Sequence, residues 1–477
     1  MSKSRIRFNA FDMTCVMHQS PGLWAHPDDQ SVRYRDLSYW VELAQLLERG
    51  KFDGLFIADV LGVYDTYRGS GDAAVRRGMQ VPVLDPTMQV SAMAAATEKL
   101  SFGVTVSTTY EQPYSLARRF STLDHLTDGR VAWNIVTSYL EGAARNLGLT
   151  RQMSHDQRYD LAAEAIDVCY KLWEGSWQDD AVVADRARQI YAEPSKVHTI
   201  DHDGAYFTVP GPHLVEPSPQ RTPVIWQAGT SPKGRAFAAQ HAEAVFTAAP
   251  TRTTLRTYVD DIRHVAATHG RDPSSIKIFT EITIVTAATD EEAHAKYQEL
   301  LSWADYEGAL AFYAGITGID LSDLDPDEPL EYVETDSARF ALEIFSKADS
   351  TRTWTPNEVV RFLSIGAMGP VLVGSAQTVA DELEAWIDEA DIDGFNLAYA
   401  TTPGTFEDFI EYVVPELQRR GRYWHDYDDG DTLRERLYGP GQPHVRDDHP
   451  AAQYRRRLHD ADLGLAEIPA AHAVASR

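Results

Sequence analysis

The sequence predicts an α/β protein built as one (β/α)₈ barrel, a TIM barrel with large insertions. Short apolar, β-branched runs alternate along the chain with longer amphipathic helical patterns, which is typical of parallel βα units. Eight such runs can be found, and eight βα units close most economically into a barrel. An open, doubly wound sheet is the alternative, but no G-x-G-x-x-G turn follows the first strand candidate.

The strand candidates are rich in Val, Ile, Phe and Ala, and the helix candidates repeat apolar residues at helical spacing. In chain order, the expected strands are residues 5–10, 54–58, 101–108, 131–137, 223–228, 244–247, 276–285 and 394–398. The clearest helices between them are expected at residues 37–49, 88–97, 115–126, 159–172 and 376–390.

The chain is longer than its barrel needs. A plain barrel takes about 250 residues, and this chain has 477. We expect a single barrel domain over residues 1–437, with insertions at about 175–222 and 302–366, and a C-terminal arm at 438–477. The arm is polar and without periodicity, so we expect it to lie on a neighbouring subunit or to fray. It therefore favours a homo-oligomer, a homodimer or homotetramer.

Composition excludes several classes of function. The chain has 44 Lys and Arg against 71 Asp and Glu, a formal charge of −27. Such a surface repels nucleic acid and anionic membrane faces. No uncharged apolar stretch approaches about 18 residues, and the N-terminus lacks the apolar core of a signal peptide. The two cysteines, Cys15 and Cys169, have no metal-ligand spacing. We therefore expect a cytoplasmic protein with no membrane contact and no metal site.

The working groups of a TIM barrel lie at the C-terminal ends of its strands. Polar residues gather at the ends of the second, third and fourth strand candidates. Strand alternation places the polar residues of the third strand on one face. The residues nominated in this way are Asp59, Thr105, Ser107, Asn134, Thr137 and Ser138.

Two expected helix beginnings follow strands and could bind an anion. The fifth strand leads through Gly229 to Ser231 and Pro232, a pattern typical of a helix start. Exposed N–H groups and the positive end of the helix dipole suit a phosphate there. His155 and Tyr159 open the long helix after the fourth strand and can donate hydrogen bonds to the same anion. An ordinary cap and a solvated first turn are the alternatives.

The loop after the first strand, residues 11–24, overhangs the barrel mouth and carries Cys15 and His18. A structural role is the alternative for His18. No local base or cation is evident that would lower the pKa of the Cys15 thiol. Cys15 is therefore equally an apolar wall residue.

Several long segments of the chain resemble one known group. They are NAFDMTCVMHQSPGLWAHPDDQ, LLERGKFDGLFIADVLGVYDTY, TVSTTYEQPYSLARRFSTLDHLTDGRVAWNIVTSY, HDQRYD, PGPHLVEPSPQRTPVIWQAGTSPKGR and IDGFNLAYATTPGTFEDFIEYVVPELQRRG. They resemble the large subunits of two-component flavin monooxygenases in the bacterial luciferase-like superfamily. The likeness runs from about residue 5 to 425. It is strongest to the nitrilotriacetate, dibenzothiophene-sulfone, dimethyl-sulfide and long-chain alkane monooxygenases.

The resemblance implies a luciferase-like barrel that binds FMN as FMNH₂, delivered by a separate, transiently bound NAD(P)H-dependent flavin reductase, with O₂ as co-substrate. Asp59, Thr105, Ser107 and Asn134 would surround the isoalloxazine ring and ribityl chain. Thr137, Ser138, His155, Tyr159, Gly229 and Ser231 would surround the phosphate.

On the substrate side, the resemblance implies catalytic roles for Cys15, His18, Tyr64 and Gln80. Tyr139 and Phe312 stand where the alkane enzyme has histidines, which implies a differently shaped, more aromatic pocket. The expected function is FMNH₂-dependent insertion of one oxygen atom from O₂ into a small organic substrate, such as an alkane or an organosulfur compound. The alternatives are a flavin-degrading riboflavin lyase of the same fold and a non-catalytic FMN-binding protein.

Overall fold

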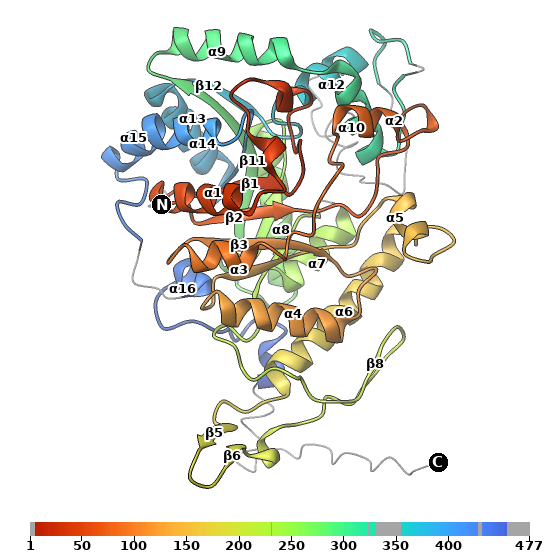
Figure 1. Cartoon of the computed structure of the whole chain (residues 1–477), viewed down its shortest axis with the longest axis vertical. Helices are drawn as coiled ribbons and strands as arrows, with labels where there is room; N and C mark the ends of the chain where they lie inside the picture. The colour runs from red at the N-terminus through yellow and green to blue at the C-terminus, as the bar shows by residue number, and fades with distance from the viewer. Residues whose placement is uncertain (1–4, 230, 323, 331–353, 428–431, 456–477) are drawn as a thin grey trace.

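The computed structural model describes residues 5–229, 231–322, 324–330, 354–427 and 432–455 (Figure 1). Within these residues, parallel strands form a closed ring in which the last strand pairs with the first. The eight strands expected from the sequence all lie in this ring, which confirms the (β/α)₈ barrel. In ring order they are β1 (Arg7–Met13), β2 (Gly54–Ala58), β3 (Ser101–Ser107), β4 (Val131–Val136), β9 (Val224–Gln227), β10 (Ala244–Thr247), β11 (Lys277–Ala287) and β13 (Gly394–Ala398).

Helices cover the outside of the ring (Figure 1). The long helix α6 begins at His155 rather than at the expected residue 159, because Ser154 and Gln157 form a capping box. Helix α3 is shorter than the expected 88–97. The principal helices after each strand are α1 (Leu37–Arg49), α3 (Val90–Ala95), α4 (Pro113–Leu126), α6 (His155–Gly175), α7 (Pro232–His241), α8 (Arg252–Thr268), α13 (Ala376–Ala390) and α15 (Val414–Arg419).

The barrel interior is a packed core and no open channel. Side chains alternate between the inner face of each strand and the helix-covered outer face. Large aromatic rings fill the middle of the interior: Phe11 packs on Phe246 with ring centroids 4.8 Å apart, and Trp226 packs on Phe279 at 4.7 Å. Filling by bulky side chains confines any cavity to the ends of the barrel.

A further strand, β12 (Val371–Ser375), was not expected from the sequence. It pairs with the C-terminal part of β11, Thr283–Ala287. The first part of β11 pairs instead with β10. Strand β11 is longer than its neighbours and extends beyond the ring. Strand β12 pairs with the edge of this extension. An unpaired strand edge is thereby removed.

The first insertion, at about 175–222, forms two antiparallel hairpins away from the barrel mouth. The hairpins are β5 (Val182–Asp185) with β6 (Ile190–Ala192), and β7 (His202–Asp203) with β8 (Thr208–Val209). In Figure 1 the first hairpin lies at the end of the molecule opposite α9 (Asp290–Trp303).

The second insertion, at about 302–366, supplies α10 (Tyr306–Thr317) and α12 (Pro356–Leu363). Helix α10 lies beside α2 (Asp72–Arg77) (Figure 1) and is almost entirely buried. A helix that is apolar all round must be covered on all sides. Residues 331–353 of this insertion lie outside the described residues.

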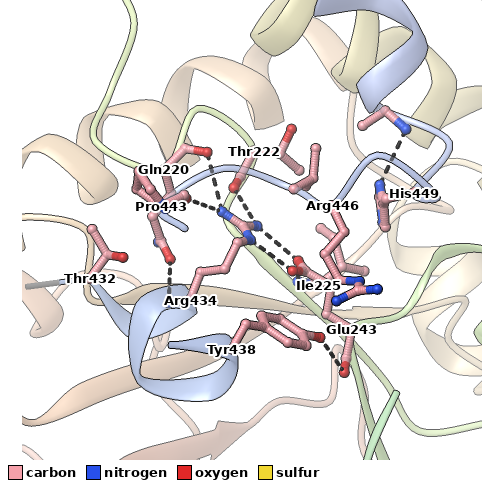
Figure 2. Close-up of polar contacts among 12 residues, drawn as sticks. Gln220, Thr222, Ile225, Glu243, Thr432, Arg434, Tyr438, Pro443, Arg446 and His449 are labelled. Atoms are coloured by element: carbon pink, nitrogen blue, oxygen red, sulfur yellow. Dashed lines mark hydrogen bonds and ion pairs between the residues drawn. The ribbon is translucent and has the colours of Figure 1, made fainter. Parts of the chain in front are cut away.

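The N-terminal end of the barrel is closed by α16 (Leu433–Tyr438). Leu433 and Leu437 pack against the barrel interior. Between them, the fully buried Arg434 forms an ion pair with Glu243 at 2.7 Å and donates to the Thr222 carbonyl at 2.8 Å (Figure 2). Because the carboxylate and the carbonyls together satisfy the guanidinium, the charge can be buried there.

Residues 439–455, part of the expected C-terminal arm, pack on their own barrel. Val445, Ala451 and Ala452 are buried, and His449 donates from Nε2 to the His241 carbonyl at 2.8 Å. These residues therefore do not fray, because apolar side chains within a polar stretch anchor them. Residues 456–477 lie outside the described residues.

Among the described helices, none combines the length and the apolar character needed to cross a bilayer.

Candidate active site

Two adjoining cavities open at the C-terminal ends of the barrel strands. The helix-end cavity, of about 210 Å³, lies at the N-termini of α6 and α7. The barrel-mouth cavity, of about 200 Å³, lies over the aromatic interior and under α10. Asp59, Val60, Val136, Tyr139 and Ala228 line both cavities. The two cavities are therefore neighbouring parts of one site.

The helix-end cavity is built by two helix beginnings that contact each other. Ser231 caps α7 by accepting a hydrogen bond from the Gly234 N–H at 3.1 Å. The same Oγ lies 3.1 Å from Nε2 of His155, the first residue of α6. Both helices direct their positive ends at this cavity, an arrangement that binds anions.

Close backbone approach shapes the same cavity. A Cβ atom at Gly229 would lie 2.4 Å from the Tyr159 hydroxyl, and one at Gly234 would lie 2.7 Å from it. Glycine is therefore required at both positions for Tyr159 to reach the cavity. Arg158 also lines the cavity and is anchored by a 2.7 Å hydrogen bond to the Met153 carbonyl. It adds a positive charge beside the helix ends.

The wall of the barrel-mouth cavity along β2, β3 and β4 carries Asp59, Thr105 and Asn134. Asn134 Nδ2 donates to Thr105 Oγ1 at 2.9 Å, whereas Asn134 Oδ1 has no partner among the described residues. Buried polar atoms are normally hydrogen-bonded. Other lining side chains with an unpartnered buried oxygen are Gln19, Thr247 and Glu281. The cavity thus offers several polar atoms to a ligand.

A chain of hydrogen bonds crosses the barrel mouth. Gln80 Nε2 donates to the His18 carbonyl at 2.9 Å, and the Tyr64 hydroxyl donates to Gln80 Oε1 at 2.7 Å. The Tyr139 hydroxyl lies 3.0 Å from that of Tyr64 and therefore donates to it. Burial raises the pKa of Tyr139 to about 12 and raises that of Tyr64 well above its usual range, so both phenols keep their protons.

Burial also sets the charge of the remaining titratable groups. It lowers the pKa of His18 to about 3, so the imidazole is neutral at neutral pH. Burial, with the nearby Asp85 carboxylate, raises the pKa of Asp59 to about 7. Burial alone raises the pKa of Glu281 to about 8. The barrel mouth is therefore an environment of low polarity with little net charge.

Most residues nominated from the sequence line one of the two cavities. Ser107 does not, but it accepts a 2.8 Å hydrogen bond from Ser138 Oγ, which does. Cys15 lies outside both linings, with its Sγ 3.0 Å from the Met17 carbonyl, and burial raises its pKa well above the usual range. The residues that line a cavity are Asp59, Thr105, Asn134, Thr137, Ser138, His155, Tyr159, Gly229, Ser231, His18, Tyr64 and Gln80.

Sequence reasoning missed Gln227, Phe246 and Glu281, which also line the cavities. Gln227 ends β9, where the rule for strand ends could have found it. Glu281 is the acidic residue inside the apolar strand KIFTEITIVTA. A lone acid in a buried strand is itself a signal, because its burial is costly.

The fold and the two cavities define a class of protein: a (β/α)₈ barrel with a cavity at two helix N-termini beside a buried, mainly apolar cavity. Comparison with known proteins then gives the family. Residues 11–393 match the model of the luciferase-like monooxygenase family. The chain belongs to this family, and it is an enzyme of the monooxygenase type.

Several characterised proteins are similar along nearly their whole length. The chain is 56% identical over 466 residues to dimethyl-sulfide monooxygenase of Hyphomicrobium sulfonivorans, covering 98% of this chain and 96% of that one. It is 52% identical over 451 residues to long-chain alkane monooxygenase of Geobacillus thermodenitrificans, covering 94% and 98%. Among solved structures, riboflavin lyase with modified FMN and riboflavin superposes with a TM-score of 0.89 at 40% identity, covering 94% of this chain and 99% of that one.

Proposed function

We propose that the protein is an FMNH₂-dependent monooxygenase that inserts one oxygen atom of O₂ into a small organic substrate, with reduced flavin supplied by a separate reductase. The observation that carries this proposal is the junction of the α6 and α7 N-termini, through His155 and Ser231, next to a buried apolar cavity. A phosphate and a flat apolar ring are the two parts of FMN that such a pair of cavities suits.

The residues present fit FMN. The helix-end cavity would hold the phosphate through Ser231, His155 and Tyr159, with room left by Gly229. The unpartnered Asn134 Oδ1 suits a ring N–H, and the β2–β4 wall would hold the isoalloxazine ring. Thr137 and Ser138 line the helix-end cavity and would also contact the phosphate.

When bound, reduced FMN would supply the two electrons that activate O₂; one oxygen atom enters the substrate and the other leaves as water. The chain's own groups position the reactants and keep solvent out. Phe312 and Ile316 of α10, with Met368, cover the barrel mouth with apolar surface. The Tyr139–Tyr64–Gln80 hydrogen bonds fix the polar edge of the cavity, and the neutral His18 can donate or accept a hydrogen bond there.

The partners and setting follow from this reaction. Reduced flavin would come from an NAD(P)H-dependent reductase that meets this enzyme transiently in the cytoplasm. We further propose a homodimer or homotetramer, a barrel domain over residues 1–437 and a C-terminal segment from 438. The relatives named for dimethyl sulfide and long-chain alkanes support an organosulfur or hydrocarbon substrate.

The test supplies the purified protein with FMN, a generic flavin reductase, NADH and O₂. Dialkyl sulfides, alkanes, sulfones and aminopolycarboxylates are offered in turn, and oxygenated product is measured against hydrogen peroxide. We expect substrate-dependent product with one of the first three classes. Oxygen consumption that yields only peroxide with every class would refute the proposal.

A riboflavin lyase is the second candidate, supported by the structural likeness to riboflavin lyase. In the same assay, a lyase consumes flavin stoichiometrically and flavin absorbance falls with turnover. A monooxygenase of external substrates leaves the flavin absorbance unchanged. A non-catalytic FMN-binding protein is disfavoured because the chain belongs to a monooxygenase family.

A further inference from the structure

Glu281 lies in the middle of β11 and lines the barrel-mouth cavity. In the ring of strands β11 stands opposite β3, so Glu281 lies across the cavity from the wall with Thr105. Asn396 of β13 is its register neighbour. Gly369 packs directly on it: a Cβ there would lie 2.8 Å from Glu281 Cγ. Glu281 is thus packed closely against Gly369 and lines the cavity.

No structural partner explains this carboxyl. Glu281 is 3% exposed, and its Oε1 has no hydrogen-bond partner among the described residues. The elements packed against it contribute Phe246 of β10, Asn396 of β13 and Gly369, none of which titrates. The titratable groups elsewhere in the lining are His18, Asp59, Tyr64 and Tyr139, and no Lys or Arg is found among the described lining residues.

A buried carboxyl without a counter-ion costs free energy when it is ionised. Burial raises the pKa of Glu281 to about 8, so at neutral pH the group is a carboxylic acid with one O–H donor. A costly buried acid in a cavity, without a partner that stabilises the fold, is typical of a functional group. Because Glu281 lines the cavity, its carboxyl group is within reach of a ligand bound there.

We propose that Glu281 contacts the substrate directly: it donates a hydrogen bond to an acceptor atom of an uncharged substrate and, with Asp59, excludes substrates that carry a carboxylate. This inference rests on the proposed function for its reaction, but it concerns binding at the barrel mouth. An anion there would be buried beside two carboxyl groups and without a cation. The helix-end cavity, with His155 and Arg158, is the part of the site that accepts negative charge.

Two variants separate the roles of this side chain. Glu281→Gln has the same shape and keeps a hydrogen-bond donor but cannot ionise. Glu281→Leu has a similar volume and no polar atom. Two probe ligands are used with these variants. Ethyl methyl sulfide is uncharged, and in (methylthio)acetate a carboxylate replaces the methyl end of its ethyl group.

The primary measurement is the infrared difference spectrum of wild type minus Glu281→Gln, each saturated with oxidised FMN. We expect a carboxylic-acid C=O band at neutral pH that is lost in the variant. Ethyl methyl sulfide should shift this band and (methylthio)acetate should not. The dissociation constant for ethyl methyl sulfide should rise in wild type above about pH 8, as Glu281 ionises, and should stay flat in Glu281→Gln. In Glu281→Leu it should be roughly five- to tenfold higher than in Glu281→Gln at every pH, because one neutral hydrogen bond to the ligand is lost.

Three results would overturn the inference: no such band, a band that the sulfide leaves unshifted, or equal dissociation constants for ethyl methyl sulfide in the Gln and Leu variants. FMN affinity, measured by flavin fluorescence in all three proteins, separates the two proposals. Failure of the wild type to bind FMN contradicts the proposed function, whereas intact FMN binding with an unshifted band contradicts only the role of Glu281. Melting temperatures verify that both variants are folded.

Discussion

Ser231 Oγ lies 3.1 Å from His155 Nε2, and this contact joins the first turns of two helices that are 76 residues apart in the chain. Ser231 also caps α7. The Ser231 hydroxyl therefore caps one helix and also keeps the N-terminal ends of two helices directed at the same cavity. Ser231 therefore contributes both to the stability of α7 and to the shape of the helix-end cavity.

Replacing Ser231 with Ala should weaken FMN binding. Loss of a hydrogen bond to a charged phosphate costs about 1.5–3 kcal/mol, which corresponds to roughly a 10- to 150-fold higher dissociation constant. Flavin fluorescence quenching measures this constant. Thr289→Ala is the matched control, because Thr289 caps α9 in the same way, far from the lining of either cavity. Both variants should lose about 1 kcal/mol of stability, and only the first should lose affinity.

Replacing Gly229 with Ala should abolish tight FMN binding without unfolding the barrel. The new Cβ would lie 2.4 Å from both Tyr159 Oη and Gln227 Nε2, so Tyr159 must leave the cavity. Gly211→Ala is the control, because nothing lies within 4 Å of a Cβ there. Calorimetric titration with FMN measures the effect. Equal affinity in the two variants would show that the Gly229 turn does not shape the binding site.

Replacing Arg434 with Met should destabilise the barrel from its N-terminal end. The change leaves Glu243 buried without its counter-ion (Figure 2), which costs about 3–5 kcal/mol. Urea unfolding followed by tryptophan fluorescence measures the loss. The double variant Arg434→Met with Glu243→Leu should recover much of it.

The matched control for Arg434 is Arg419→Met. Arg419 pairs with Glu416 on the surface with its side chain 68% exposed, so we expect almost no change in the free energy of unfolding. Equal destabilisation by the two substitutions would contradict a special role for the buried pair.

Replacing Asp12 with Asn should stabilise the protein increasingly as pH rises. Burial raises the pKa of Asp12 from 3.8 to about 8, so between these values the folded chain holds a proton that the unfolded chain releases. Stability of the wild type therefore falls as pH rises through this window. The asparagine side chain does not titrate, so the difference between variant and wild type should grow from about pH 4 to about pH 8 and then level off.

Urea unfolding at several pH values measures this difference for Asp12→Asn. Asp185→Asn is the control: the Asp185 carboxyl is partly exposed, and its hydrogen bond with Arg188 lowers its pKa, so its contribution to stability is constant across that range. A pH-independent difference for Asp12→Asn would show that Asp12 is ionised in the folded protein.

The elements that the sequence predicted well share a strong local signal. Helix α13 (Ala376–Ala390) and strand β2 (Gly54–Ala58) lie at the expected residues. β12 was missed because its pairing depends on how far β11 extends beyond the ring. Glu281 was missed because only burial and the absence of a partner distinguish it from an ordinary acidic residue.

The sequence by itself determined the barrel, because period-two and helical hydrophobic patterns are local properties, and it placed polar residues at the strand ends and at two helix beginnings. Only the tertiary structure decided that His155 and Ser231 touch, that Cys15 lines neither cavity while Tyr139 lines both, and that residues 439–455 pack on their own barrel. Such contacts join segments that are distant in the chain. They bury ionisable groups away from water, and this burial sets which of those groups carry charge. Neither effect is encoded in local spacing.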